Sequence, residues 1–397
     1  MDNPTQNPRQ QTTLLTCTLF TFFVSGAASQ LMGPLLPYLR EAYGLSYDLS
    51  GLLLSFQSAG NFLAVILTGF LPYWVGRRKS ILITSVWMAL AFLIFSTGLS
   101  AAPLLLGAFF MVGFSRGGNS NFSNTMISTL PGEKATRGYN LLHGCFAAGA
   151  VLSPLMLLLV AGSLPGVGWR VAAGIMGALC VIQVVVYCKV PLPPEHSKRG
   201  EHTLDWSFLR VRQFWLGSAM LFFYISAEYA ITGWLVTYFR DVGILSAGYS
   251  QMMNSLLWLV IFCGRMMGAW LTGRISRSRL LVMDGVGMFG FFLLMFFGRS
   301  AAQVVVGLMG VGLFMATIYT TAYAIGSDCV KGNDLGNSVM ILTGTFGGVV
   351  TPAVVGLVAE SSGIRAGMGL VVVLTGLLLC SILLSVGSLW ARKKRAE

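Results

Sequence analysis

The sequence contains little charge. Asp, Glu, Lys and Arg make up 10% of its 397 residues, and only 14 residues are acidic, whereas a soluble domain of average composition has about 25% charged residues. Hydrophobic residues reach 55%, and the mean hydropathy is +0.74. A single soluble core rarely grows beyond about 250–300 residues. The composition therefore excludes one large soluble core and predicts a membrane protein.

Several chemical signatures are also missing. The seven cysteines have no CxxC or other metal-ligand spacing, and the three histidines form no HExxH pattern. No Walker loop occurs, so direct use of ATP is not expected. The longest polar connection, VPLPPEHSKRGEHTLDWSFLRVR at 190–212, is too short for a catalytic domain. We therefore expect no enzyme activity, no metal and no other cofactor.

Long apolar runs occupy most of the chain. A transmembrane helix needs about 20 mainly apolar residues. Twelve runs meet this requirement, and the polar segment 190–212 divides them six and six. The twelve predicted spans are 13–38, 50–74, 80–98, 103–128, 139–162, 169–189, 213–239, 248–272, 279–298, 302–326, 337–359 and 366–390.

The basic residues predict an orientation. A net charge of +12 could suggest nucleic-acid binding, but in a protein with many spans Lys and Arg set the topology. With the N-terminus in the cytoplasm, nineteen of the 26 basic residues fall in cytoplasmic segments, five in outer loops, and Arg116 and Arg265 inside spans. This bias predicts that both termini are cytoplasmic, and we expect no nucleic-acid partner.

The two halves of the chain repeat each other. Leu142, Gly144 and Phe146 recur as the same three residue types 200 positions later. A parallel 6+6 repeat implies two helical bundles around a central site, with one bundle rocking against the other. We therefore expect an N-terminal six-helix bundle at 1–190, a cytoplasmic linker at 191–212 and a C-terminal six-helix bundle at 213–397.

These features resemble the major facilitator superfamily. The segment GFLPYWVGRRK at 69–79 is similar to the loop 2–3 signature of that superfamily, glycine-x-leucine-x-aspartate-arginine-x-glycine-arginine-arginine or lysine. Tyr73 stands in place of the signature aspartate, which normally takes part in a charge lock on the cytoplasmic side. The resemblance implies a gate, built here without that lock, that includes Gly69, Gly76, Arg77 and Arg78.

A narrower resemblance is to the fucose–glucose–galactose–proton symporter-like branch. It rests on the stretches QLMGPLLPYLREAYGLS, NLLHGCFAAGAVLSPL, YISAEYAITGWLVTYF and GLFMATIYTTAYAIGSD. Fucose permeases have an aspartate in the first span and a glutamate in the fourth, where this chain has Gly33 and Ser120. Proton coupling of the fucose type therefore does not carry over. The resemblance still implies transport of a sugar or sugar derivative.

The fourth span is interrupted by the polar stretch GFSRGGNSNFSNT at 113–125. At 3.6 residues per turn, most of its polar side chains form one stripe, and Asn121 lies off it. The stripe consists of Arg116, Asn119, Ser120, Ser123 and Asn124. A charge at the bilayer centre costs at least about 2.5 kcal/mol, so it faces a cavity or a partner. We predict a substrate-binding face with Arg116 as the anchor for an anion or for hydroxyls. The alternative is an arginine held by a carboxylate or carbonyls for packing and gating.

Glu228 is the one acid near the middle of a predicted span, and it shares a helix face with Tyr224 and Thr232. It could couple protons, bind a substrate hydroxyl, or balance Arg116; a static ion pair is the alternative. His143, in the fifth span, is a second candidate for proton coupling because histidine titrates near neutral pH. The alternative is that His143 only packs against a neighbouring helix, as the family pattern implies.

Other polar residues inside spans complete the candidate set. Arg265, near the cytoplasmic end of the eighth span, is predicted to act at a gate or the lipid interface rather than on substrate. Asp284 and Glu360, near span ends, are assigned no role in transport.

Aromatic residues beside amides suit a polar organic solute such as a sugar, with core packing as the alternative. These further substrate-binding candidates are Gln30, Gln57, Asn61, Asn254, Trp258, Tyr319 and Tyr323.

The sequence thus predicts an all-α integral membrane protein of the major facilitator fold. We expect a secondary active transporter that moves a small polar solute, either a sugar, a sugar derivative or an anionic relative of these, by alternating access and with protons as the driving ion. The alternatives are a proton-driven exporter of a metabolite or drug, and a non-transporting receptor. The expected setting is the lipid bilayer of a bacterial cytoplasmic (inner) membrane, and the resemblance implies a monomer.

Overall fold

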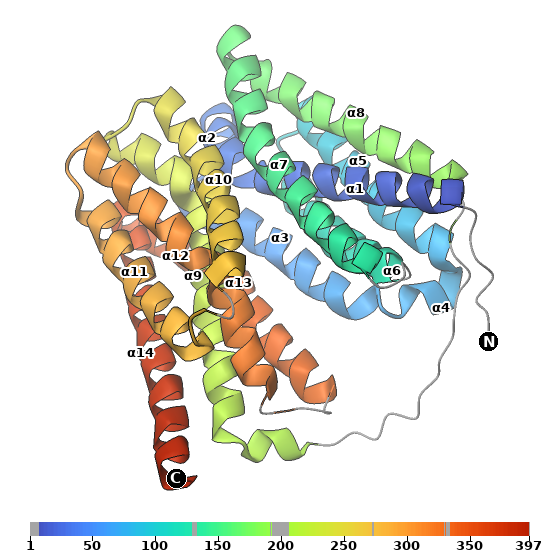
Figure 1. The fold of residues 1–397 in the computed structure, drawn as a ribbon. Coiled ribbons are helices and arrows are strands. Elements are labelled where there is room, and N and C mark those ends of the chain that lie inside the picture. Colours follow the sequence, from blue (N-terminus) through green and yellow to red (C-terminus); the bar gives the residue numbers. More distant parts are fainter. Residues whose placement is uncertain are drawn as a thin grey trace. The chain divides into compact units, whose positions relative to one another are not determined.

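The computed structural model describes residues 8–128, 133–190, 192, 206–271, 274–328, 330 and 334–396. Figure 1 shows that the described chain is built from helices. It forms two compact units, one of Met1–Gly44 with Phe56–Arg199 and the other of Leu45–Ser55 with Gly200–Glu397. Most of the predicted linker at 191–212, including its two histidines, lies outside the described residues.

The helices follow the predicted spans closely. The first unit contains α1 (Pro8–Gln30), α2 (Met32–Tyr43), α4 (Leu71–Val75), α5 (Arg77–Thr97), α6 (Ala102–Ser128), α7 (Glu133–Ser163) and α8 (Gly168–Lys189). The second contains the short 3-10 helix η1 (Ser207–Arg210), α9 (Arg212–Val242), α10 (Ala247–Leu271), α11 (Arg277–Phe297), α12 (Ala301–Asp328), α13 (Asp334–Ser362) and α14 (Ile364–Ala396). Helix α3 (Tyr47–Leu67) contributes its first turns to the second unit and the remainder to the first.

Within the described residues, eleven helices are long and apolar enough to cross a membrane. The prediction of an integral protein with many spans is therefore confirmed. Helix α6, the predicted fourth span, is not among the eleven, because the polar stretch around Arg116 lowers its hydropathy. Its 27 residues would still extend about 40 Å at 1.5 Å per residue. The count of twelve spans and the cytoplasmic location of the termini stay predictions.

Two predicted spans differ from the observed helices. The first, 13–38, is broken at Leu31 into α1 and α2, because Pro34 has no N–H to donate to the carbonyl oxygen of Gln30. The second predicted span, 50–74, is also interrupted: α3 ends at Leu67, and α4 follows as a separate short helix. Hydropathy alone misses such breaks, since the residues remain apolar on both sides.

The internal repeat reappears in the packing of each unit. Helix α1 packs on α7 in the first unit as α9 packs on α13 in the second. Helix α5 packs on α6 and α8, and α11 packs in the same way on α12 and α14. Helices α5 and α11 both have 21 residues and begin 200 positions apart, each at an arginine.

Helices α5 and α8 are joined at both ends by arginines. The guanidinium group of Arg78 donates to the carbonyl oxygens of Cys188 and, at 2.8 Å, of Val190 at the end of α8. Arg170, near the start of α8, donates from Nε to the carbonyl oxygen of Ser96 at 3.3 Å and from a second nitrogen to that of Thr97. The last carbonyls of a helix lack partners within the helix, so each arginine satisfies groups that would otherwise remain unpaired.

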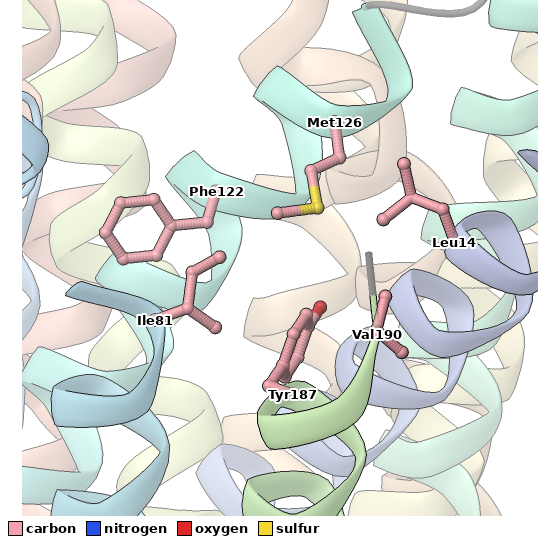
Figure 2. Close-up of a cluster of buried hydrophobic side chains, with 6 residues drawn as sticks. All are labelled: Leu14, Ile81, Phe122, Met126, Tyr187 and Val190. Carbon is pink, nitrogen blue, oxygen red and sulfur yellow. The ribbon is translucent and has the colours of Figure 1, made fainter. Parts of the chain in front are cut away.

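A hydrophobic cluster lies next to the Arg78 end of α8. Figure 2 shows its side chains converging from four helices. Its members are Leu14 of α1, Ile81 of α5, Phe122 and Met126 of α6, and Tyr187 with Val190 at the end of α8. All six are at most 7% exposed, so this end of the first unit has a packed core that positions the polar face of α6.

In the second unit, the first turns of α3 pack on α13 around Pro352. The backbone N–H of Ala353 donates to Ser55 Oγ at 3.0 Å, and Trp234 Nε1 donates to the carbonyl oxygen of Pro352 at 3.2 Å. Proline interrupts the hydrogen-bond ladder of a helix, and these side chains bond backbone groups at the interruption. Nearby, the backbone N–H of Tyr47 donates to Glu360 Oε2 at 2.7 Å, which gives Glu360 a structural contact.

Candidate functional site

The polar stretch of α6 packs closely against α3. A Cβ atom on Gly113 would overlap the carbonyl oxygen of Gln57, and one on Gly117 would lie 2.6 Å from the Cβ atom of Ala64. Both contacts are to α3. Only a residue without a side chain fits at these two positions, so α3 and α6 approach each other closely.

The residues GFSRG at 113–117 also match the G-x-S-x-G pattern of hydrolases. That pattern needs a serine on a sharp turn between a strand and a helix. Ser115 instead lies within α6 and is 0% exposed. It cannot act as an exposed nucleophile in this structure.

The predicted stripe on α6 divides into a buried edge and an accessible edge. Asn119 and Ser123 are each 1% exposed, and Asn119 Oδ1 accepts a hydrogen bond from Thr84 Oγ1 of α5 at 3.1 Å. Arg116, Ser120 and Asn124 are more accessible. The helical periodicity identified the stripe, whereas the packing of α5 decides which half of it remains open.

Arg116 has an aromatic neighbour. Its Cζ lies 5.7 Å from the centre of the Phe146 ring on α7, a geometry that allows a cation–π interaction. The Phe146 ring contacts that of Phe22 at 5.6 Å, and Phe22 meets the exposed His143 edge-on at 5.7 Å. Two candidates, Arg116 and His143, are therefore linked through the same pair of phenylalanines.

The C-terminal end of α6 lines a cavity of about 460 Å³. Asn121 Nδ2 donates to Thr68 Oγ1, directly after the end of α3, at 2.8 Å. Asn124 also lines the cavity, together with the gate candidates Gly69 and Arg77. A predicted substrate-binding residue and two predicted gate residues thus share one cavity within the first unit.

The remaining candidates of the first unit lie along α1, α3 and the turn before α5. Gln57 Nε2 donates to the carbonyl oxygen of Ser29 at 3.0 Å, and its neighbour Gln30 is 8% exposed at the break after α1. Asn61 lies beside Gly117. Gly76 has a φ of 83° between α4 and α5, a region that favours glycine.

In the second unit, the candidates gather around Glu228 on α9. Tyr224, one turn before it, is 2% exposed, and its ring centre lies 6.2 Å from that of Tyr319 on α12. Tyr319 stacks on Tyr323 at 6.4 Å with an interplanar angle of 6°. Glu228 interacts electrostatically with both Tyr224 and Tyr319. The structure therefore places Tyr319 and Tyr323 of α12 next to the pair Tyr224 and Glu228, which the sequence had put on one helix face.

Helix α10 contributes a second group of candidates. Asn254 and Trp258, one turn apart, are 0% and 3% exposed. Arg265 is half-buried and interacts electrostatically with Tyr224.

Asp284 is a buried acid that the sequence reasoning passed over. It is 4% exposed on α11, and its carboxylate accepts a hydrogen bond from Thr317 of α12. It also interacts electrostatically with Tyr224. Asp284 is the eighth residue of α11, and in the sequence it lies near the start of the predicted span 279–298. The rule that any ionisable residue within a span is a functional candidate would have identified it.

The two groups offer complementary chemistry. An arginine fork binds carboxylates, phosphates or vicinal hydroxyls, whereas a glutamate among tyrosines can accept from hydroxyls or carry a proton. Among the described residues, no group of three or more His, Cys, Asp or Glu side chains is placed to hold a metal ion.

Comparison with known proteins places these features in a family. The chain is 24% identical over 383 residues to the membrane protein MosC of Rhizobium meliloti, covering 94% of this chain and 90% of MosC. It is 24% identical over 387 residues to the L-fucose-proton symporter of Escherichia coli (strain K12), covering 88% and 87%. The fold matches the inward-facing, occupied crystal structure of a bacterial homolog of the human lysosomal transporter Spinster. That match has a TM-score of 0.77 at 15% identity and covers 96% of this chain and 97% of the other.

The family model of the Major Facilitator Superfamily matches residues 18–331. This match confirms the superfamily resemblance that the sequence indicated, and the fucose symporter among the relatives agrees with the narrower one. The chain therefore belongs to the Major Facilitator Superfamily, a family of transporters and not of enzymes.

Proposed function

We propose that the protein is a proton-driven secondary transporter of a small polyhydroxylated solute, either a sugar, a sugar derivative or an anionic relative of these. The observation that carries this proposal is the group formed by Glu228 with Tyr224, Tyr319 and Tyr323. Aromatic rings beside a carboxylate suit the apolar faces and hydroxyls of a sugar. The relationship to an L-fucose-proton symporter supports the same substrate class.

We assign different tasks to the two charged residues. Arg116, whose guanidinium group lies over Phe146, anchors a carboxylate or a pair of hydroxyls. Glu228 exchanges a proton during the cycle, and Gln57, Asn61 and Asn254 contribute further polar contacts. The six-helix bundles at 1–190 and 213–397 move against each other in alternating access, as parallel repeats do in this kind of transporter. The setting we propose is the bacterial inner membrane.

The polar residues inside spans argue against a receptor without transport activity. Ionisable groups at these depths are costly and usually mark substrate or ion pathways. A purely structural bundle would have little reason to keep both Arg116 and Glu228 within its spans.

Uptake by purified protein in proteoliposomes tests the proposal. A panel of radiolabelled sugars, sugar acids and organic acids is offered with and without an imposed inward proton gradient. We expect saturable uptake of at least one polyhydroxylated solute, which the gradient drives above equilibrium and a protonophore abolishes. If preloaded vesicles instead lose the solute in a saturable way, transport runs in the opposite direction and the protein is an exporter. The absence of saturable flux for every solute in either direction would reject transport of this class.

A further inference from the structure

Four helices of the first unit enclose a layer of buried polar side chains. Helix α1 packs on α6 and α8, and α5 packs on the same two helices, so the four form a closed ring. Toward one end of the ring, the hydrophobic cluster of Figure 2 fills the interior. Toward the other end, the rings of Phe92 and Phe109 both meet that of Phe95 edge-on, and all three are at most 1% exposed. The polar layer between these ends consists of Ser25 of α1, Thr84 and Ser85 of α5, Ser115, Asn119 and Ser123 of α6, and Gln183 of α8.

Two amide side chains of the layer are only half satisfied. Asn119 Oδ1 accepts from Thr84 Oγ1 at 3.1 Å, and Gln183 Nε2 donates to Ser85 Oγ at 2.9 Å. The other polar atom of each amide, Asn119 Nδ2 and Gln183 Oε1, has no hydrogen-bond partner among the described residues. The first of these atoms can only donate and the second can only accept. The α6 and α8 sides of the ring therefore carry complementary groups.

Three serine hydroxyls of the layer are in the same situation. Within the described part of the chain, the Oγ atoms of Ser25, Ser115 and Ser123 have no hydrogen-bond partner, although each residue is at most 1% exposed. On α1, by contrast, Thr18 and Thr21 donate to carbonyl oxygens of their own helix at 2.8 and 2.9 Å. Buried polar groups in proteins are nearly always paired, either with the protein or with ordered water. Five such atoms in one layer thus point to a shared partner.

The equivalent positions of the second unit are filled by larger, less polar side chains. The register follows from Tyr38 and Gly107, which recur as the same residue types 200 positions later, and from Gly168-Trp-Arg at the start of α8, which recurs as Gly363-Ile-Arg 195 positions later. In this alignment Ser25, Ser115, Ser123 and Gln183 correspond to Ile225, Met315, Tyr323 and Leu378. The small serines of the first unit therefore leave space where the second unit has bulk.

We propose that this layer binds ordered water, which joins α6 to α8 across the ring. A water molecule accepts from Asn119 Nδ2 and donates to Gln183 Oε1, either directly or through a second water, and the serine hydroxyls complete its bonds. Buried water typically makes about three hydrogen bonds to otherwise unsatisfied groups. Water fits better than an ion, because all seven members of the layer are uncharged. The bound water holds α6, the helix that carries Arg116, and it is independent of the transport proposal.

X-ray radiolytic footprinting of the purified full chain, read by mass spectrometry, detects buried water. Hydroxyl radicals formed from bound water oxidise the side chains next to it. Met88 lies one turn after Thr84 on the same face of α5 and is 0% exposed. Met295 of α11 is buried to the same extent, against Gly307, and is the control within the same molecule. We expect Met88 to be oxidised at several times the rate of Met295, and equal rates in the wild type would overturn the proposal.

Variants of the two amides test which groups hold the water. Gln183→Leu introduces the residue type found at position 378, and Asn119→Leu removes the other amide. In the double variant, oxidation of Met88 should fall to the level of Met295. Unchanged oxidation of Met88 there would overturn the proposal, because the water would then be held by other groups.

Gln213→Leu is the matched control variant. Gln213 is also buried, but it lies in the second unit and is fully satisfied, because its Nε2 donates to Ser385 Oγ and its Oε1 accepts from Ser388 Oγ. This substitution should leave oxidation of Met88 unchanged. A fall as large as that in the double variant would overturn the assignment to Asn119 and Gln183, since any loss of a buried amide would then suffice.

Discussion

Arg78 caps the C-terminus of α8, and Arg170 caps the C-terminus of α5. Each arginine lies within the first three residues of its own helix and donates to the last carbonyl groups of the other. A cation at a helix C-terminus also interacts favourably with the helix dipole. The two antiparallel helices are thus fastened at both ends by the same device.

Arg170→Ala should lower the stability of the first unit by about 1–2 kcal/mol, the range for a partly exposed charged hydrogen bond and a helix-end charge together. Arg170→Lys should recover part of this loss, because lysine keeps the charge but not the two-nitrogen geometry. The apparent midpoint of thermal unfolding in detergent measures the effect. Arg299→Ala, at an exposed position, is the control, and an equal shift in both variants would contradict the capping role.

Gly113→Ala should destabilise the protein by at least about 2 kcal/mol. The added methyl group would overlap the carbonyl oxygen of Gln57, and overpacking against backbone typically costs about 1–3 kcal/mol or more. Gly107→Ala is the matched control on the same helix, because nothing lies within 4 Å of its added Cβ. Alanine should be neutral or slightly stabilising there. Thermal unfolding that ranks the two variants in the opposite order would show that α3 and α6 do not approach as described.

Arg116→Ala should weaken substrate binding by at least about a hundredfold, since a charged hydrogen bond contributes about 1.5–3 kcal/mol and the arginine fork can make two. Arg116→Lys should give an intermediate loss. Ligand-induced stabilisation of purified protein measures the affinity, and a monodisperse elution profile checks the fold. Wild-type affinity in Arg116→Ala would mean that this arginine serves packing or gating instead.

Glu228→Gln should abolish uphill accumulation while leaving counterflow, because the amide preserves the shape of the side chain but cannot carry a proton. Proteoliposomes with and without a proton gradient separate the two activities. Tyr323→Phe is a useful comparison, since it keeps the stacked ring next to Tyr319 and should preserve coupling. Normal accumulation by Glu228→Gln would exclude this residue from proton coupling and turn attention to His143 and Asp284.

Much of the architecture follows directly from where apolar and polar residues occur along the sequence. Apolar runs of about 20 residues have few alternatives to membrane helices, so ten of the twelve predicted spans agree with the observed helices to within a few residues at most ends. Where the prediction differs, as at Leu31 and Leu67, the cause is a local break within a run that stays apolar.

The candidate site was less accessible to sequence reasoning, because burial depends on neighbours from distant segments. Periodicity placed Arg116 and Asn119 on one stripe, but Asn119 is buried and bonded to Thr84 of α5, whereas Arg116 is partly accessible. Spacing put Asp284 near a span end, but packing of α11 against α12 buries it beside Thr317.

The sequence by itself determined the membrane environment, the approximate helix boundaries and the repeat of 200 residues, because these depend on hydropathy and order along the chain. Tertiary structure decided which polar residues meet. Glu228 and Tyr319 lie on different helices and come together only when α9 packs on α12. Arg277 and Asp328 likewise lie on different helices, and they form an ion pair only because α11 packs on α12.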